Sequence, residues 1–526
     1  MTTSTTGAPA RGAGGSGMPR IARGGVLNLV GAGITAVTGV LLVVVVTRAL
    51  PQEQAGVFFA LTSLFLLAEV VARLGTGTGL VYFIARLRRL DRAGEIRAVQ
   101  RVALTPVVVV ALLAAAVLLL WTPYFAELLG GDAPGTRAAT VVLAVLLPVT
   151  TLSDTLLSAT RGYATMLPTV ALDKVGRPVL QLALVAIAVT GGSLALLTGA
   201  WAVPWALSAV LAWLWLRRLS RDLPTPRASR QAGEGWREFW TFTGPRAINS
   251  IAALALQRLD VLLVTVLSGP AAAAVYTAAT RFLVVGQLVN QSISTAAQPR
   301  LAEVLAVDDR ASASTVYRSA TAWIVLLTWP LYLLCAVFAE SVLSIFGEGY
   351  AAGRPVILVL AGAMLFATAC GMVDMLLNMA GRTAWTLANS LVALVVMIVV
   401  DLLLIPPMGI LGAAIGWAAA IVANNLLPLT QLVLAYGLHP FGRATLSASG
   451  LAAVCFGVLP VVARLLAPGN PVVALGSVAV GSALYLLAVR RWRAALGLPS
   501  LRSLRPGRRR PSPSAEDDRS PLGGTL

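Results

Sequence analysis

The chain has 526 residues, of which 57% are hydrophobic and only 12% charged, and its mean hydropathy is +0.83. Soluble domains carry about 25% charged residues, so this composition excludes a soluble protein and indicates one that lies in a membrane. The net charge of +18 would suggest nucleic-acid binding in a soluble protein, but here the basic residues follow the membrane topology, and no nucleic-acid partner is expected.

Apolar segments follow one another along the chain, and each is about as long as a membrane-spanning helix, which needs about 20 apolar residues. We predict an all-α polytopic membrane protein with about 14 spans. The segments are 26–47, 55–84, 102–121, 138–160, 166–190, 193–216, 245–267, 271–297, 319–338, 355–378, 383–405, 409–436, 445–466 and 471–489. The pair 166–190 and 193–216 is the weakest, because Asp173 and Lys174 interrupt the first of the two.

Arginine residues gather in alternate connections between these segments. The basic connections lie at 20–23, 86–101, 217–237 and 490–510, whereas the intervening ones hold little beyond Arg48, Arg137 and Arg354. Cytoplasmic loops are enriched in Lys and Arg, so both termini are predicted to lie in the cytoplasm. The expected location is therefore the plasma membrane, with many passes.

The first and second sets of six spans repeat each other weakly at an offset of 217–218 residues. The segment 57–62 aligns with 275–280, and the glycines Gly192 and Gly199 align with Gly409 and Gly416. Six crossings return the chain to the same side, so the two repeats are parallel. Transporters built in this way bind substrate between the repeats and rock one against the other.

This repeat sets the predicted domain organisation. We expect an N-lobe at 19–216, a basic cytoplasmic linker at 217–244, a C-lobe at 245–436 and two additional spans at 437–489. The tails 1–18 and 490–526 are rich in small, basic or Pro/Ser residues and are predicted to be disordered.

Charged residues inside spans cost at least about 2.5 kcal/mol each, so they are candidates for function. Glu69 and Arg73 lie four residues apart on one helix face, in the favourable order for an ion pair. In the seventh span, Arg258 and Asp260 point to opposite sides of the helix, and Asp260 shares a face with Asn249. The structural alternative to substrate binding is a salt bridge, which Arg73 would form with Glu69 and Arg258 with an acid on a neighbouring helix.

A polar stripe follows the eighth predicted span, and a stripe of that length cannot face lipid at low cost. It should therefore line a wet cavity. Its members are Tyr276, Thr280, Gln287, Gln291, Ser294 and Gln298. Arg281 lies roughly 100–140° from the centre of this stripe, but its long side chain still places it among the cavity candidates.

Several short motifs recur in the order and spacing of one known family. They include Thr47–Pro51 followed by Ala55–Phe58, Arg258-Leu-Asp260 followed by Val275–Arg281, and the stretch Asp401–Ala414. With these motifs, residues 20–440 resemble the polysaccharide-flippase (Wzx-type) branch of the multidrug/oligosaccharidyl-lipid/polysaccharide exporter superfamily, which also includes lipid II flippases and MATE exporters.

The resemblance implies a V-shaped pair of six-helix lobes that alternate between inward and outward openings, and a polyprenyl-diphosphate glycan moved from the inner to the outer leaflet. It also implies that Arg281 contacts the lipid diphosphate; the planar guanidinium of an arginine suits phosphate oxygens. The expected partners are this glycolipid, membrane lipid and glycan-assembly enzymes. An Asn usually occupies the place of Asp401 in the family, so this acid indicates either a functional difference or a side chain facing the outer water.

The energy source and the rival functions stay open at this point. No phosphate-binding loop is present, so direct ATP coupling is excluded, and neither cofactor nor metal is expected. The membrane potential, or a cation at Glu69, Asp260 or Asp401, remains as the source. The main alternative function is MATE-like export of small molecules. An enzyme and a non-transporting scaffold are weaker alternatives, because the outer loops are short and the cavity arginines are present.

Overall fold

The computed structural model describes residues 18–130, 135–221, 223–224 and 232–491, and throughout these residues the regular structure is helical. The helices of the first half are α1 (Met18–Ala49), α2 (Gln52–Ala72), α3 (Thr76–Arg89), α4 (Ile96–Leu120), α5 (Thr122–Gly130), α6 (Thr136–Gly162), α7 (Arg177–Ala188) and α8 (Leu194–Leu219).

The second half contains a similar series, followed by an addition at the C-terminal end. Its helices are α9 (Ala232–Ser268), α10 (Pro270–Ala279), α11 (Phe282–Ala306), α12 (Arg310–Val337), α13 (Ala339–Ser344), α14 (Arg354–Cys370), α15 (Val373–Met379), α16 (Thr383–Met408) and α17 (Ile410–Tyr436). The addition consists of α18 (Arg443–Ala452), α19 (Leu459–Leu466) and α20 (Pro471–Arg491).

The prediction of many membrane spans is confirmed, but the number 14 is not. Twelve described helical stretches are long and apolar enough to cross a membrane, and the pair α10 and α11, bent by 42°, adds a thirteenth. The expected span 166–190 does not qualify. It forms a π-helical segment, Thr169–Gly176, followed by the 12-residue helix α7, and it contains Asp173, Lys174 and Arg177. These three charges make this stretch more polar than a lipid-facing span.

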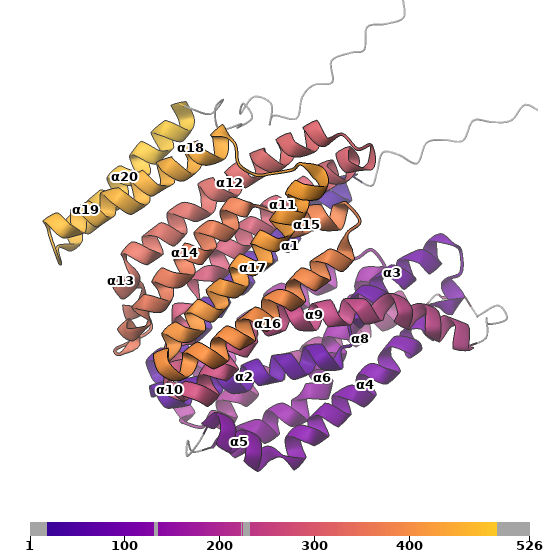
Figure 1. Cartoon of the computed structure of the whole chain (residues 1–526). Helices are drawn as coiled ribbons and strands as arrows, with labels where there is room; N and C mark the ends of the chain where they lie inside the picture. The colour runs from indigo at the N-terminus through magenta and orange to yellow at the C-terminus, as the bar shows by residue number, and fades with distance from the viewer. Residues whose placement is uncertain (1–17, 131–134, 222, 225–231, 492–526) are drawn as a thin grey trace, which may run out of the picture.

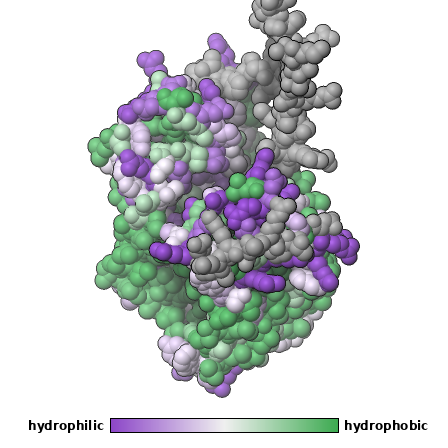
Figure 2. Space-filling view, turned by 90° about the vertical axis from the view of Figure 1, so that its right-hand side faces the viewer, coloured by the Kyte–Doolittle hydropathy of each residue, from purple (hydrophilic) through white to green (hydrophobic). Residues whose placement is uncertain are grey.

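The outer surface has the character of a membrane protein. Large apolar side chains point outward on many helices, among them Leu120, Leu434 and Leu466, which are about four-fifths exposed. Figure 2 shows a broad hydrophobic surface over the lower part of one face, with hydrophilic residues gathered above it. Such a surface is stable only against lipid.

The order of helices repeats between the two halves. Helices α2 and α10 begin at Gln52 and Pro270, and α8 and α17 begin at Leu194 and Ile410, which is close to the offset of the sequence repeat. We therefore refer to α1–α8 as the N-lobe and to α9–α17 as the C-lobe. Figure 1 shows α18, α19 and α20 at one edge, where α18 packs on α12 of the C-lobe.

A break divides the second predicted span into α2 and α3. Helix α2 ends at Ala72, and Leu74 and Gly75 adopt positive φ angles of 51° and 66° before α3 begins. Gly75 also lies against α9, so close that an added Cβ would come within 2.6 Å of the backbone nitrogen of Ala247. The backbone angle and the close approach both require glycine here.

The two lobes touch at both ends of this broken span. Near the start of α2, Gly56 lies directly against the carbonyl oxygen of Pro270 at the start of α10. Close by, Arg48 donates hydrogen bonds of 2.8 and 2.7 Å to the carbonyl oxygens of Ile345 and Ser344. At the other end, the rings of Tyr82 on α3 and Phe242 on α9 stack with centroids 4.4 Å apart. A cavity lies between these two contacts.

Candidate substrate cavity between the lobes

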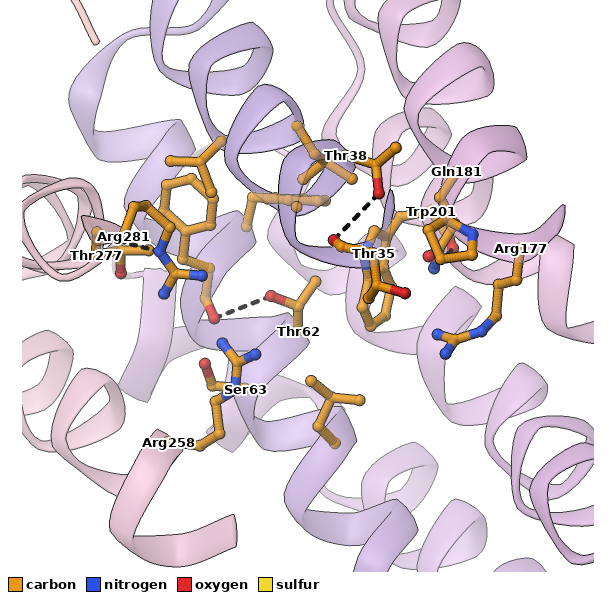
Figure 3. A pocket seen from close by; sticks show the side chains of 17 residues that line it. Thr35, Thr38, Thr62, Ser63, Arg177, Gln181, Trp201, Arg258, Thr277 and Arg281 are labelled. Atoms are coloured by element: carbon orange, nitrogen blue, oxygen red, sulfur yellow. Dashed lines mark hydrogen bonds between the residues drawn. The ribbon is translucent and has the colours of Figure 1, made fainter. Parts of the chain in front are cut away.

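A cavity of about 150 Å³ lies at the interface of the two lobes. Its N-lobe wall is formed by α1, α2, α7 and α8, and its C-lobe wall by α9, α10 and Arg281, which lies between α10 and α11. Figure 3 shows Arg281 and Thr277 on one side, Arg177 and Gln181 on the opposite side, and Arg258 with Ser63 below. Three arginines from both lobes therefore surround one space.

Arg281 occupies the break between α10 and α11. Its Nε donates a 3.0 Å hydrogen bond to the carbonyl oxygen of Thr277, which holds the side chain along α10. Within the described residues, no carboxylate forms an ion pair with Arg281, and its terminal guanidinium nitrogens make no hydrogen bond. The charge of Arg281 is therefore not neutralised by any described acid and faces the cavity.

Arg258 reaches the same cavity from α9. Asp260, two residues later, points into the C-lobe, as expected from the helical period. Asp260 accepts hydrogen bonds from the hydroxyl of Tyr276 at 2.8 Å and from the backbone N–H of Val261 at 2.7 Å. The salt bridge considered for Arg258 is not formed by any described acid, so this guanidinium also faces the cavity without an ionic partner.

Arg177 is the cavity residue that the sequence analysis missed. It begins α7, lies over the ring of Trp205 at 4.4 Å and pairs with Asp173 one turn earlier. Lys174 also lies 3.5 Å from the Asp173 carboxylate. The spacing of Asp173 and Arg177, four residues apart on one helix face, was the available signal.

Arg73 does not line this cavity. Its guanidinium lies 3.7 Å from Glu69 and 3.3 Å from Asp154 on α6, so the structure favours the salt-bridge alternative. Asp154 therefore helps to neutralise Arg73. The side chain of Glu69 is only 5% exposed. This cluster therefore joins α2 to α6 inside the N-lobe.

We expect Arg73→Ala to destabilise the protein. The substitution leaves Glu69 and Asp154 buried without their cation, which costs about 3 kcal/mol for a buried pair. The melting temperature of the purified protein should fall, and the double variant Arg73→Ala/Glu69→Gln should recover part of the loss. An unchanged melting temperature combined with lost substrate binding would instead assign Arg73 to the substrate.

The acid Asp401 lies inside the C-lobe. It is fully buried, which contradicts the alternative that it faces the outer water. Both carboxylate oxygens lack a hydrogen-bond partner among the described residues, and Gly416 of α17 passes directly against one of them. Tyr276 is also fully buried and bonded to Asp260, so its predicted place on a cavity-lining stripe is wrong. Thr280, 5% exposed, is likewise buried.

The remainder of the polar stripe lines a second cavity, of about 440 Å³, between α11, α14, α15 and α17. Gln287 and Gln291 lie on its α11 wall, as expected for a wet cavity. Asn378, Asn424 and Asn425 add further side-chain amides from α15 and α17. Amides both donate and accept hydrogen bonds, which suits sugar hydroxyls. Asn249, by contrast, is exposed on α9 and lines neither cavity.

The comparisons with known proteins agree with this arrangement. A family model described as "Polysaccharide biosynthesis protein" matches residues 21–305, which is more than half of the chain. The chain belongs to the polysaccharide biosynthesis protein family. A second model, described as MatE, matches residues 245–403. This member of the family is thus a Wzx-like protein of the multidrug/oligosaccharidyl-lipid/polysaccharide exporter superfamily, and a multi-pass transporter of the plasma membrane.

One curated relative and several solved structures are similar to this family member. It is 22% identical over 252 residues to the "Probable low-salt glycan biosynthesis flippase Agl15" of Haloferax volcanii, and spans about half (52%) of that protein's length.

Among the structures, an inward closed conformation of the lipid II flippase MurJ matches with a TM-score of 0.70 at 12% identity, covering 88% of this chain and 98% of that one. An inward-facing MATE family transporter matches with a TM-score of 0.61 at 13% identity, covering 76% and 93%. At these identities, the likeness establishes the fold.

Proposed function

We propose that this protein flips a polyprenyl-diphosphate-linked oligosaccharide from the inner to the outer leaflet, for the synthesis of a cell-surface polysaccharide. The observation that carries the proposal is the cavity between the lobes, where Arg258 and Arg281 lack ionic partners and Arg177 faces them from the N-lobe. Arginine binds phosphate oxygens through paired, charge-assisted hydrogen bonds. A diphosphate held by both lobes would follow the rocking movement of such transporters.

The second cavity supports the glycan part of the proposal. Gln287 lies on α11, six residues after Arg281 at the N-cap of that helix, which is about 9 Å along the axis. A diphosphate at Arg281 would therefore place the first sugars toward the amides of Gln287 and Gln291. With both termini in the cytoplasm, as predicted, the substrate would enter this route from the inner leaflet. Glycan-assembly enzymes are expected to supply the glycolipid there.

The direct test is lipid analysis of cells depleted of this protein, with leaflet-resolved labelling of polyprenyl-diphosphate glycans. The expected result is accumulation of one complete glycan intermediate in the inner leaflet. No change in any lipid-linked glycan, while the glycan is still made and no paralogue replaces the protein, would overturn the proposal. The alternative, MATE-like export of small molecules, rests on the MatE match over 245–403 and predicts altered drug sensitivity in the same cells.

We further propose that Asp260 and Asp401 bind a coupling cation, because two buried carboxylates with so few partners are costly without one. In vesicles, Asp401→Asn should abolish the acceleration of flipping by an imposed Na⁺ or proton gradient, while leaving the response to a K⁺-diffusion potential. Asp308→Asn, at an acid of the C-lobe that is 74% exposed and lines neither cavity, is the control. A wild-type protein that responds to voltage alone would contradict cation coupling.

A further inference from the structure

A groove of about 620 Å³ opens where α3, α6 and α9 meet, away from the cavity between the lobes. Four arginines line it: Arg86 and Arg89 from α3, Arg161 from α6 and Arg246 from α9. No acidic side chain belongs to its described lining. The hydrophilic residues on the face in Figure 2 gather in this part of the molecule, above the hydrophobic surface.

Most of this positive charge is not neutralised. Arg86 lies 2.5 Å from Glu238, but Arg89 forms no ion pair with a described residue. Arg246 donates to the carbonyl oxygen of Phe242 in its own helix at 2.6 Å and lies over the Phe242 ring, 3.7 Å from its centroid, so it has no anionic partner among these contacts. Arg161 donates to the hydroxyl of Ser158 at 2.6 Å, and its buried Nε has no hydrogen-bond partner in the described part of the chain.

The arrangement differs from that of isolated arginines reaching toward water at a membrane surface. Such side chains extend outward separately. Here they converge from three helices, and one of them keeps a buried donor unpaired, which costs free energy unless an acceptor binds. Phosphate oxygens are acceptors that match several guanidinium groups at once.

The other wall of the groove is apolar. Tyr82, which is 44% exposed, stacks on Phe242, and Val81 lies in the same wall. A free phosphate ion would gain no binding energy from this apolar wall, whereas an acyl chain would bury it. Aromatic side chains also favour the level of lipid headgroups.

We propose that this groove binds the phosphate of an anionic phospholipid, whose acyl chains lie along the exposed ring of Tyr82 and along Val81. The arginines belong to both lobes, three to the N-lobe and Arg246 to the C-lobe. The bound lipid therefore holds α3 against α9 and stabilises the state in which the lobes touch on this side.

Binding is measured on the purified, delipidated full chain by native mass spectrometry during titration with phosphatidylglycerol. We expect the double variant Arg89→Gln/Arg246→Gln to require about tenfold more lipid for half occupancy, as expected when about 1.4 kcal/mol of binding is lost. The matched control is Arg217→Gln/Arg218→Gln, which removes two arginines from the end of α8, and it should bind as the wild type does. A photoactivatable phosphatidylglycerol should cross-link to peptides that contain Tyr82 or Phe242.

Competition experiments with phosphatidylcholine, inorganic phosphate and a polyprenyl diphosphate show which phosphate-containing molecule the groove binds. Phosphatidylcholine and inorganic phosphate should compete weakly with phosphatidylglycerol. Equal binding by the double variant and the control, at equal melting temperatures, would overturn the site. Displacement of phosphatidylglycerol by low concentrations of a polyprenyl diphosphate would overturn the lipid assignment and make the groove part of the substrate route. The variant Arg89→Gln alone, at an exposed side chain, repeats the test if the double variant does not fold.

Discussion

Arg281→Ala is expected to slow flipping by about 100-fold, because it removes two charge-assisted hydrogen bonds to the diphosphate, worth about 3 kcal/mol together. Arg281→Lys keeps the charge but loses the planar fork, so it should recover part of the rate. The measurement is transfer of a fluorescent polyprenyl-diphosphate glycan across vesicles that contain the purified protein.

The matched control for this prediction is Arg300→Ala on the same helix, α11. Arg300 is 62% exposed and pairs with the equally exposed Glu303, so its removal should change flipping by less than about twofold. All variants must show wild-type melting temperatures for the comparison to hold. Equal rates for Arg281→Ala and Arg300→Ala would show that Arg281 does not hold the substrate.

Gly56→Ala is expected to abolish transport while leaving the protein folded. The added methyl group would collide with the carbonyl oxygen of Pro270, so the two lobes could no longer meet at the start of α2 and α10. Alanine is about 1 kcal/mol more favourable than glycine in a helix, so α2 itself is not weakened. Any loss of transport therefore reports on the contact between the lobes.

The control is Gly362→Ala in α14, where an added Cβ has no neighbour within 4 Å. A cysteine in place of the cavity residue Thr62, with the three native cysteines replaced, reports opening through its labelling by a membrane-impermeant thiol reagent. Gly56→Ala should increase labelling from the outer side. The same labelling and transport in both glycine variants would refute this role of Gly56.

Much of the fold could be predicted because length and apolarity alone define a spanning helix. The segment 166–190 was the exception, since its charges Asp173, Lys174 and Arg177 and its π-helical turn place it between a span and a polar helix. The break at Gly75 was also foreseeable from glycine spacing, although its second cause, the close approach of Ala247, appears only in the folded chain.

The site was less predictable, because it depends on which helices face each other. The helical period separates Arg258 from Asp260, but it does not show which of the two faces the other lobe. The spacing of Glu69 and Arg73 in the sequence indicated their ion pair. The second partner of Arg73, Asp154, lies on another helix, so no local pattern could indicate it. The burial of Asp401 depends on the approach of Gly416 from α17, which no local pattern in the sequence reports.

Because Arg258 and Arg281 have no ionic partner, the charge of the cavity depends on whether substrate is bound. This charge determines whether the loaded or the empty carrier responds to the membrane potential. On the proposed function, a bound diphosphate carries about two negative charges and balances the two arginines, so the loaded cavity is nearly neutral. The empty cavity keeps both positive charges, and an inside-negative potential favours its return by about 2.3 kcal/mol per charge for each 100 mV. The total energy that the membrane potential supplies over a full cycle is the same as if it acted on the diphosphate itself. The potential then drives the step in which the empty carrier returns to face the inner leaflet.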